Sequence, residues 1–161
     1  MSPVEHLFLS DDPFEAPADR QLIESVESEL GVTLPEAYIA LAGRHNGGLL
    51  AKDAHPSPAP TTWAESHVGV HSIAAIGRTA PFSLCGEQGS AFWVQEWGYP
   101  DIGVYFADCP SAGHDMIALD YRHGGEPTVV HVDQEVGYRI TALAPDVASF
   151  LRGLAPHSTF S

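Results

Sequence analysis

The sequence predicts an α+β domain in which a largely antiparallel central sheet carries an N-terminal helix pair and a C-terminal helix, packed mainly on one side. Three observations lead to this prediction: two short amphipathic helices before residue 48, several short apolar strands between residues 102 and 142, and a last amphipathic helix after residue 145. The length of 161 residues suits one domain, and the 44% of apolar residues is enough for a folded core.

The two N-terminal helices have recognisable ends. Asp19 is a suitable N-cap for a helix through Leu30, whose apolar residues recur at helical spacing, and Gly31 can adopt the left-handed conformation that ends it. Pro35 is favourable at the start of a second helix because its missing N–H is not needed there. The run 46–48, Asn-Gly-Gly, predicts a sharp turn after that helix.

The domain is predicted to span residues 19–155, between an N-terminal arm (1–18) and a C-terminal tail (156–161). The arm is rich in proline and aspartate and has no period, although its apolar residues 7–9 suit an edge strand or a docking patch.

The middle of the chain has weaker signals. Three prolines in residues 53–66 predict a surface loop, with Trp63 anchoring it to the body. Residues 70–76 read as a strand whose side chains alternate between two faces. Ser90 is expected to cap a helix that runs to Trp97.

The C-terminal half supplies the sheet. Its short strands are separated by turns rich in glycine, so neighbouring strands are expected to pair antiparallel. Pro145 opens a helix with apolar residues at i, i+3, i+4 and i+7, and this face needs a sheet to cover. The expected strands are 102–107, 116–121, 128–133 and 138–142.

Charge and composition exclude several classes of protein. The formal net charge is −14, and the seven Lys and Arg residues are scattered, so direct nucleic-acid binding is disfavoured. No apolar run is long enough for a membrane span, and the N-terminus lacks a basic signal-peptide region, so a cytoplasmic location is expected. Cys85 and Cys109 lie in no metal-type spacing and are expected to be free thiols. The acidity serves either solubility or steering toward a basic partner.

Four residues carry the metal-site hypothesis: His114, Asp115, His131 and Asp133. Imidazole and carboxylate groups can bind a divalent ion that activates water, and His131 and Asp133 point to the same face of one strand. Against this, the sequence has no HExxH and no Cys/His ligand spacing. Such residues also bond backbone amides at turns and strand ends, and this structural use is the prediction, with no catalytic residue, metal or cofactor.

Several short runs resemble the SUKH superfamily, which includes fungal cell-wall-assembly regulators and bacterial immunity proteins. In the N-terminal part they are Glu27, Leu30-Gly31, Leu34-Pro35, Tyr38 and Asn46-Gly47-Gly48. The later runs are Trp97-Gly98-Tyr99-Pro100, Gly113-His114-Asp115, Leu119-Asp120-Tyr121, Gly125-Glu126-Pro127 and His131-Val132-Asp133-Gln134-Glu135. Each run is weak alone, but their order and spacing extend the resemblance over about residues 20–155.

The resemblance implies a non-enzymatic protein that neutralises a cognate polymorphic or contact-dependent toxin, often a nuclease. The chain does not show the long disordered flanks expected of the fungal regulators, which favours the bacterial branch. Two alternatives stay open: a regulatory or scaffold module of the cell-wall-assembly type, and a metal-dependent hydrolase.

The expected partner is a basic protein, a toxin domain, and a homodimer is also left open. An acidic protein can dock in the basic cleft of a nuclease by electrostatic steering and charge-assisted hydrogen bonds. Contact residues are predicted from their expected exposure rather than from the family, and Tyr99 is included because Pro100 should place it in a turn. The candidates are Glu24, Glu27, Glu96, Tyr99, Asp101 and Asp108.

Overall fold

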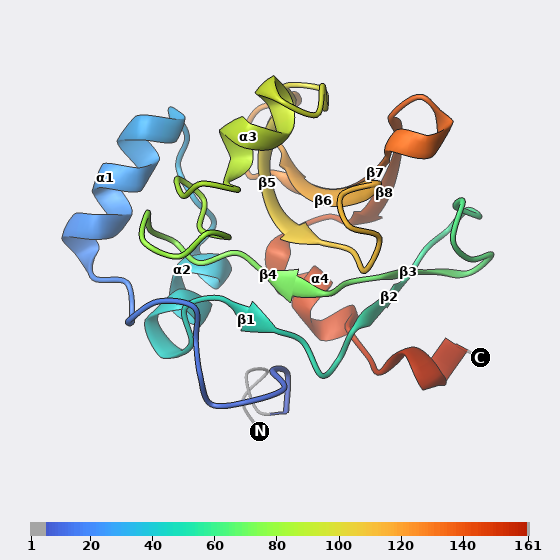
Figure 1. Cartoon of the computed structure of the whole chain (residues 1–161), viewed down its shortest axis with the longest axis horizontal. Helices are drawn as coiled ribbons and strands as arrows, with labels where there is room; N and C mark the ends of the chain where they lie inside the picture. The colour runs from blue at the N-terminus through green and yellow to red at the C-terminus, as the bar shows by residue number, and fades with distance from the viewer. Residues whose placement is uncertain (1–5, 161) are drawn as a thin grey trace.

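A six-stranded antiparallel sheet with the strand order β1-β4-β5-β6-β7-β8 forms the centre of the molecule, in a computed structural model that describes residues 6–160. Helices α1, α2 and α4 contribute to the core on one face of this sheet, and α3 covers the other face (Figure 1). The predicted α+β class is therefore confirmed. The strands are β1 (Gly48–Leu49), β4 (Ser72–Ile73), β5 (Gly103–Asp108), β6 (Asp115–Asp120), β7 (Thr128–Asp133) and β8 (Arg139–Ala144).

The N-terminal helices form where their caps predict. The Asp19 side chain accepts a hydrogen bond from the backbone N–H of Leu22 at 2.8 Å and caps α1 (Arg20–Leu30), and Gly31 ends this helix at φ 73°. Helix α2 (Glu36–Arg44) follows Pro35. A carboxylate oxygen of Glu27 accepts a hydrogen bond from the backbone N–H of Leu34 at 2.7 Å and so ties the two helices together.

The segment before α1 packs on the domain. Leu7 is fully buried, and Phe8 forms an isolated antiparallel bridge with Leu50. The backbone N–H of Leu9 also bonds the carbonyl of Leu49 in β1, so this segment lies along the outer edge of the sheet. The first five residues of the predicted arm, and Ser161 of the predicted tail, lie outside the described residues.

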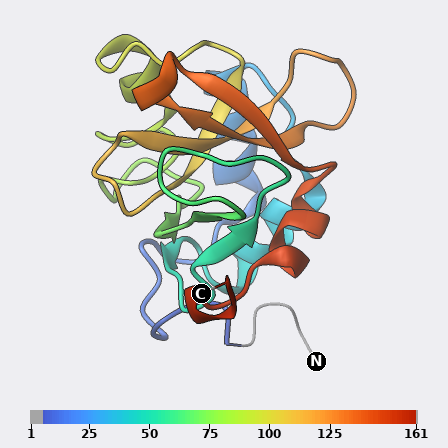
Figure 2. The same cartoon turned by 90° about the vertical axis from the view of Figure 1, so that its right-hand side faces the viewer.

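The prediction of a continuous loop over residues 53–66 is wrong. Residues Ala54–Pro56 form β2 and pair antiparallel with β3 (His67–Gly69), and Pro56 can end the strand because no further N–H is required there. Trp63 is not the anchor, since it is 51% exposed. The hairpin loop is fixed instead by Thr62, whose N–H and hydroxyl both donate to Asp133, and it lies beside β7 and β8 (Figure 2).

The expected strand over residues 70–76 is reduced to β4, Ser72–Ile73. The alternation between two faces is not observed, because Val70 and every residue from Ser72 to Ile76 are buried. Strand β4 lies inside the sheet between β1 and β5, and Ala75 after it forms a bridge with Ser83. Burial on both faces therefore removes the polar face that a surface strand would show.

The remaining elements lie close to the predicted ranges. Helix α3 (Ser90–Gln95) begins after Gly89, and the Ser90 hydroxyl does not cap it but accepts a hydrogen bond from the N–H of Tyr105. Asp146 caps α4 (Val147–Gly153) through the N–H of Ser149. Two short 3-10 helices, η1 (Gln134–Val136) and η2 (His157–Phe160), complete the described chain.

Two apolar clusters occupy the two faces of the sheet. The larger one joins side chains of α1, α2 and α4 to Phe106, Ile117 and Leu119 of the sheet. The smaller one lies under α3 and is rich in aromatic rings, with Trp93, Tyr99 and Tyr105 among its members.

Candidate binding surfaces

A buried polar cluster forms between β6 and β7, on the sheet face that carries the larger apolar cluster. Nε2 of His131 lies 2.7 Å from a carboxylate oxygen of Asp115, whose other oxygen accepts a hydrogen bond from the hydroxyl of Ser111. The thiol of Cys109 completes the cluster, and burial together with the neighbouring Asp115 carboxylate raises the pKa of this thiol. His131 is fully buried, and Asp115 and Cys109 are almost so. Nδ1 of His131 has no hydrogen-bond partner among residues 6–160.

The structure brings together two of the four residues of the metal-site hypothesis. Asp133 bonds Thr62 and caps η1 through the N–H of Glu135. His114 lies at the surface with Nδ1 2.6 Å from Glu135. Of the four, only Asp115 and His131 bond each other through their side chains, although Asp115 also faces Asp133 across the two strands. Cys109 joins them from the start of the β5–β6 connection, and no ligand spacing in the sequence indicated it.

The ligand atoms of Cys109, Asp115 and His131 all lie within 4.8 Å of one another. Thiolate, imidazole and carboxylate are ligands that zinc accepts. However, a catalytic metal needs an open coordination position, and these three residues are enclosed by the core. The Asp115 carboxylate is already shared by hydrogen bonds to His131 and Ser111, so the arrangement favours a structural role.

The predicted contact residues fall in separate places. Glu24 is exposed on α1, and with the half-buried Glu27 it lines a shallow depression near the end of this helix. Glu96 and Asp101 are exposed on the segment between α3 and β5. Asp108 lies at the far end of β5, where it accepts a hydrogen bond from the Ser72 hydroxyl and burial raises its pKa.

The expectation that Tyr99 lies exposed in a turn is wrong. Its side chain is 2% exposed, and its hydroxyl donates to the carbonyl of Gly113. The ring makes edge contacts with Trp93, Tyr105 and Tyr138, so the aromatic cluster under α3 holds it in place. Burial also raises the pKa of the phenol, and Tyr99 is therefore a core residue.

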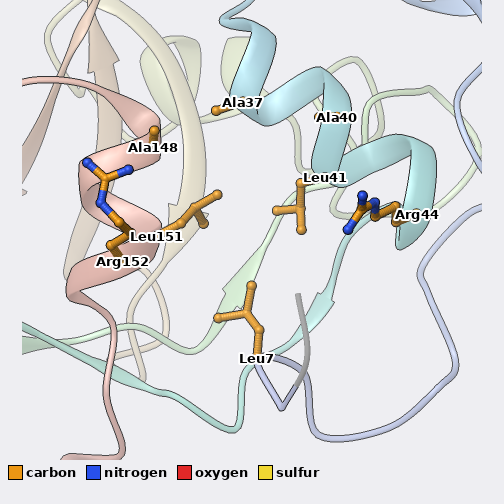
Figure 3. A pocket seen from close by; sticks show the side chains of 8 residues that line it. All are labelled: Leu7, Ala37, Ala40, Leu41, Arg44, Ala148, Leu151 and Arg152. Atoms are coloured by element: carbon orange, nitrogen blue, oxygen red, sulfur yellow. The ribbon is translucent and has the colours of Figure 1, made fainter. Parts of the chain in front are cut away.

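A groove that the sequence did not indicate lies between α2 and α4. Leu41 of α2, Leu151 of α4 and Leu7 of the N-terminal segment point toward its centre (Figure 3). Arg44 and Arg152 flank it, and the remaining lining residues are alanines: Ala37, Ala40 and Ala148. The sequence feature that could have indicated this groove is the pair Ala37 and Ala40, which lie one turn apart on α2 and leave space beside Leu41.

The order of the elements and the Asn-Gly-Gly turn after the helix pair agree with the SUKH pattern. The SMI1 / KNR4 family (SUKH-1) matches this chain over residues 17–153. The chain belongs to the SMI1 / KNR4 family (SUKH-1). No curated protein sequence matches it.

The SUKH-1 match covers α1 through α4 and thus includes the whole sheet. Members of this family are generally non-catalytic immunity or regulatory proteins. Among residues 6–160 there is no helix of the length and apolar character that a membrane crossing requires.

Proposed function

We propose that this SUKH-1 protein is a cytoplasmic, non-enzymatic immunity protein that binds and neutralises a cognate polymorphic or contact-dependent toxin. The observation that carries the proposal is the combination of SUKH-1 membership with a net charge of −14. A nuclease cleft must attract phosphate and is therefore basic, so a strongly acidic protein is suited to block it.

Two acidic places are the proposed contacts. Glu24 and Glu27 line the depression at the end of α1, and Glu96 and Asp101 project from the α3–β5 segment. Asp108 is kept as a weaker candidate because Ser72 and His71 already occupy its carboxylate. Glu27 also fixes Leu34, so its replacement would disturb the helix pair and give an ambiguous result.

The direct test is co-expression with the toxin domain encoded beside the gene. Under this proposal the two proteins copurify and the cells survive. If the toxin kills equally well with and without the chain, the immunity function is wrong. Capture of a cell-wall-assembly protein together with failure to protect would support the regulatory alternative instead.

Charge reversals locate the surface. Glu24→Lys and Asp101→Lys are at exposed positions, so each should leave the fold intact and weaken toxin binding by about tenfold if it faces the basic cleft. Glu65→Lys makes the same change of charge on the exposed β2–β3 loop and is the matched control. Equal loss in all three variants would indicate a general charge effect without a defined contact.

A homodimer is a separate part of the proposal. Strand β8 is the last strand in the sheet order, and an edge strand can pair with a second chain. Light scattering across a range of protein concentrations would detect such a dimer, and a constant monomer mass would rule it out.

A further inference from the structure

The carboxylate of Glu15 lies against a loop, residues 77–83, that follows β4 much later in the chain. One carboxylate oxygen accepts hydrogen bonds from the backbone N–H groups of Thr79 at 3.1 Å and Ala80 at 3.2 Å. The hydroxyl of Ser83 donates to the same oxygen. Three donors of the 77–83 loop therefore converge on a single oxygen atom.

The donors of this loop form a site for an anion. Two of them are the N–H groups of consecutive residues, and consecutive N–H groups that point to one place form an anion-binding concavity. Ser83 is fully buried, so its hydroxyl needs an acceptor inside the protein. Arg78 belongs to the same loop, but its guanidinium pairs with Glu29 of α1 at 3.0 Å. The loop therefore binds the Glu15 carboxylate through neutral donors.

Gly77 leaves the space that this carboxyl group occupies. A Cβ atom at position 77 would overlap the Glu15 carboxyl group, whose carbon and two oxygens are the three atoms nearest to it. The φ of Gly77 is not in the left-handed region, so its backbone conformation does not require glycine. The absence of a side chain at this position is thus explained by the close approach of the carboxyl group.

Backbone hydrogen bonds hold the segment that carries Glu15. The N–H groups of Phe14 and Glu15 donate to the carbonyls of Gly47 (3.1 Å) and Asn46 (3.2 Å) in the turn after α2. The side-chain amide of Asn46 donates in return to the carbonyl of Ala16 at 2.9 Å. Because the segment is fixed beside this turn, its carboxylate meets the 77–83 loop at a high effective concentration.

We propose that the 77–83 loop is a carboxylate-binding site, and that Glu15 is its ligand, supplied by the same chain. The free ligand that fits this site is a small monocarboxylate, because the donors converge on one oxygen and Gly77 leaves room for a planar carboxyl group. Residues 14–18 of the predicted arm thus form a strap that closes on the domain through this site. The proposal does not depend on the immunity function, since Glu15 is not among the proposed contacts with a toxin.

Other anions fit the loop less well. Phosphate and sulfate have four oxygens, and those that the three donors do not reach would be buried without partners. Chloride can accept the hydrogen bonds, but it does not fill the space beside Gly77 that the carbon of the carboxyl group occupies. A carboxylate is therefore the anion that both the donors and the space favour.

The test replaces the tethered ligand by a free one. Glu15→Ala removes two carbons and both carboxylate oxygens, and acetate supplies the same four atoms. Melting temperatures of the variant and of the unchanged protein are compared in about 0.2 M sodium acetate and in sodium chloride of equal ionic strength, which screens charges equally. Acetate should raise the melting temperature of Glu15→Ala by about 3 °C more than that of the unchanged protein, because only the variant offers the site. Equal responses of the two proteins would overturn the proposal.

Two controls test whether the response comes from this site. Trimethylacetate has the same charge but is too bulky for the space beside Gly77, so it should not stabilise Glu15→Ala; stabilisation equal to that by acetate would contradict the proposal. Asp19→Ala removes another carboxylate, one that accepts a single N–H at the exposed start of α1, and acetate should not restore its stability. Restoration of Asp19→Ala to the same degree would also contradict a site specific to the 77–83 loop.

Hydrogen exchange measured by NMR locates the bound acetate. The N–H groups of Thr79 and Ala80 should exchange about tenfold faster in Glu15→Ala than in the unchanged protein, and acetate should slow them again. Unchanged exchange of these two N–H groups in acetate would place the anion elsewhere and overturn the proposal. If Glu15→Ala does not fold in chloride, its refolding yield in acetate gives the same comparison, and no gain in yield would count against the site.

Discussion

Gly47 lies at the point where the turn after α2 passes closest to the segment that follows β4. Its φ is 78°, and a Cβ atom there would lie 2.7 Å from the backbone N of Ala75. Gly124 has nearly the same φ, 75°, but no atom of the described part of the chain lies within 4 Å of the position that its Cβ would take. Replacing each glycine by alanine therefore separates two destabilising effects: the unfavourable dihedral angle, present at both positions, and the steric clash, present only at Gly47.

We expect Gly47→Ala to lower the free energy of unfolding by about 3 kcal/mol or more, since the left-handed conformation alone costs about 1–2 kcal/mol. Gly124→Ala should cost only the conformational part. Urea denaturation of both variants measures the difference, and equal costs would show that Ala75 moves away freely.

Asn46 is fully buried, and its side chain connects two segments of the backbone by hydrogen bonds. Its amide group donates to the carbonyls of Ala16 and Ile76, and its oxygen accepts from the N–H of Ile76. Asn46→Ala would leave these backbone groups buried without partners, so we expect a loss of about 3 kcal/mol in denaturant experiments. Serine at this position is the control, because a hydroxyl retains part of the bonding. A loss below about 1 kcal/mol would mean that water replaces the amide.

His131 should matter for stability and not for chemistry. His131→Ala removes the partner of a buried carboxylate, and we expect it to cost about 3 kcal/mol. His123→Ala is the control, because the His123 side chain is 71% exposed and its loss should cost less than about 0.5 kcal/mol.

Thermal unfolding of the unchanged protein and of His131→Ala measures this cost, and it also tests whether the cluster of Cys109, Asp115 and His131 binds a metal. Added zinc or a chelator should leave the melting temperature of the unchanged protein where it is. A shift that His131→Ala abolishes would show that this buried cluster binds a metal, in contradiction to the expected purely structural role.

At the scale of elements, β2 is held to α4 through a histidine. The ring of His55 stacks on Phe150 with a centroid distance of 4.9 Å, and it approaches Gly153 so closely that a Cβ there would lie 2.5 Å from its Nε2. Burial lowers the pKa of His55, although a hydrogen bond to the carbonyl of Pro56 partly offsets this effect. The neutral imidazole thus belongs to the folded state.

This contact predicts a dependence of stability on pH. As the pH falls below about 6.5, the unfolded chain binds a proton at His55 but the folded chain does not, so the free energy of unfolding declines until the folded-state pKa is reached. The slope approaches about 1.4 kcal/mol per pH unit for this group. Between pH 7.5 and 5, the free energy of unfolding of His55→Gln should change less steeply with pH than that of the unchanged protein, by up to the contribution of one proton. His123→Gln should keep the slope of the unchanged protein. Parallel curves for all three proteins would refute the assignment.

Helix caps and regular apolar spacing made most helices and strands predictable from the sequence. Elements that depend on contacts between distant residues were not predictable in this way. Strand β7 has the predicted bounds, and α1 starts and ends at its predicted caps. Strand β2 was missed because its stability comes from pairing with β3 and from the bridge between Ala54 and Ala155, which are contacts over long separations in the chain.

At the scale of the whole molecule, the charge governs the proposed association with a toxin. If steering by the acidic surface carries the affinity, the dissociation constant of the complex should rise several-fold between about 0.05 and 0.5 M salt, as the Debye length shortens from about 14 to about 4 Å. Calorimetric titrations at several salt concentrations measure this. An affinity that does not change with salt would indicate an apolar interface and would contradict steering by the acidic surface.

Composition and local order determined the class of the protein, its acidity and its family, because caps, strand periodicity and motif spacing depend on neighbours in the chain. Only the tertiary structure decided which residues meet. Tyr99 is enclosed in the aromatic cluster, and Cys109 lies next to Asp115 and His131. Arg44 and Arg152 lie on opposite sides of an apolar groove. Each of these arrangements includes a contact between different elements, such as Asp115 of β6 with His131 of β7, and such contacts follow from strand pairing and from the packing of helices on the sheet.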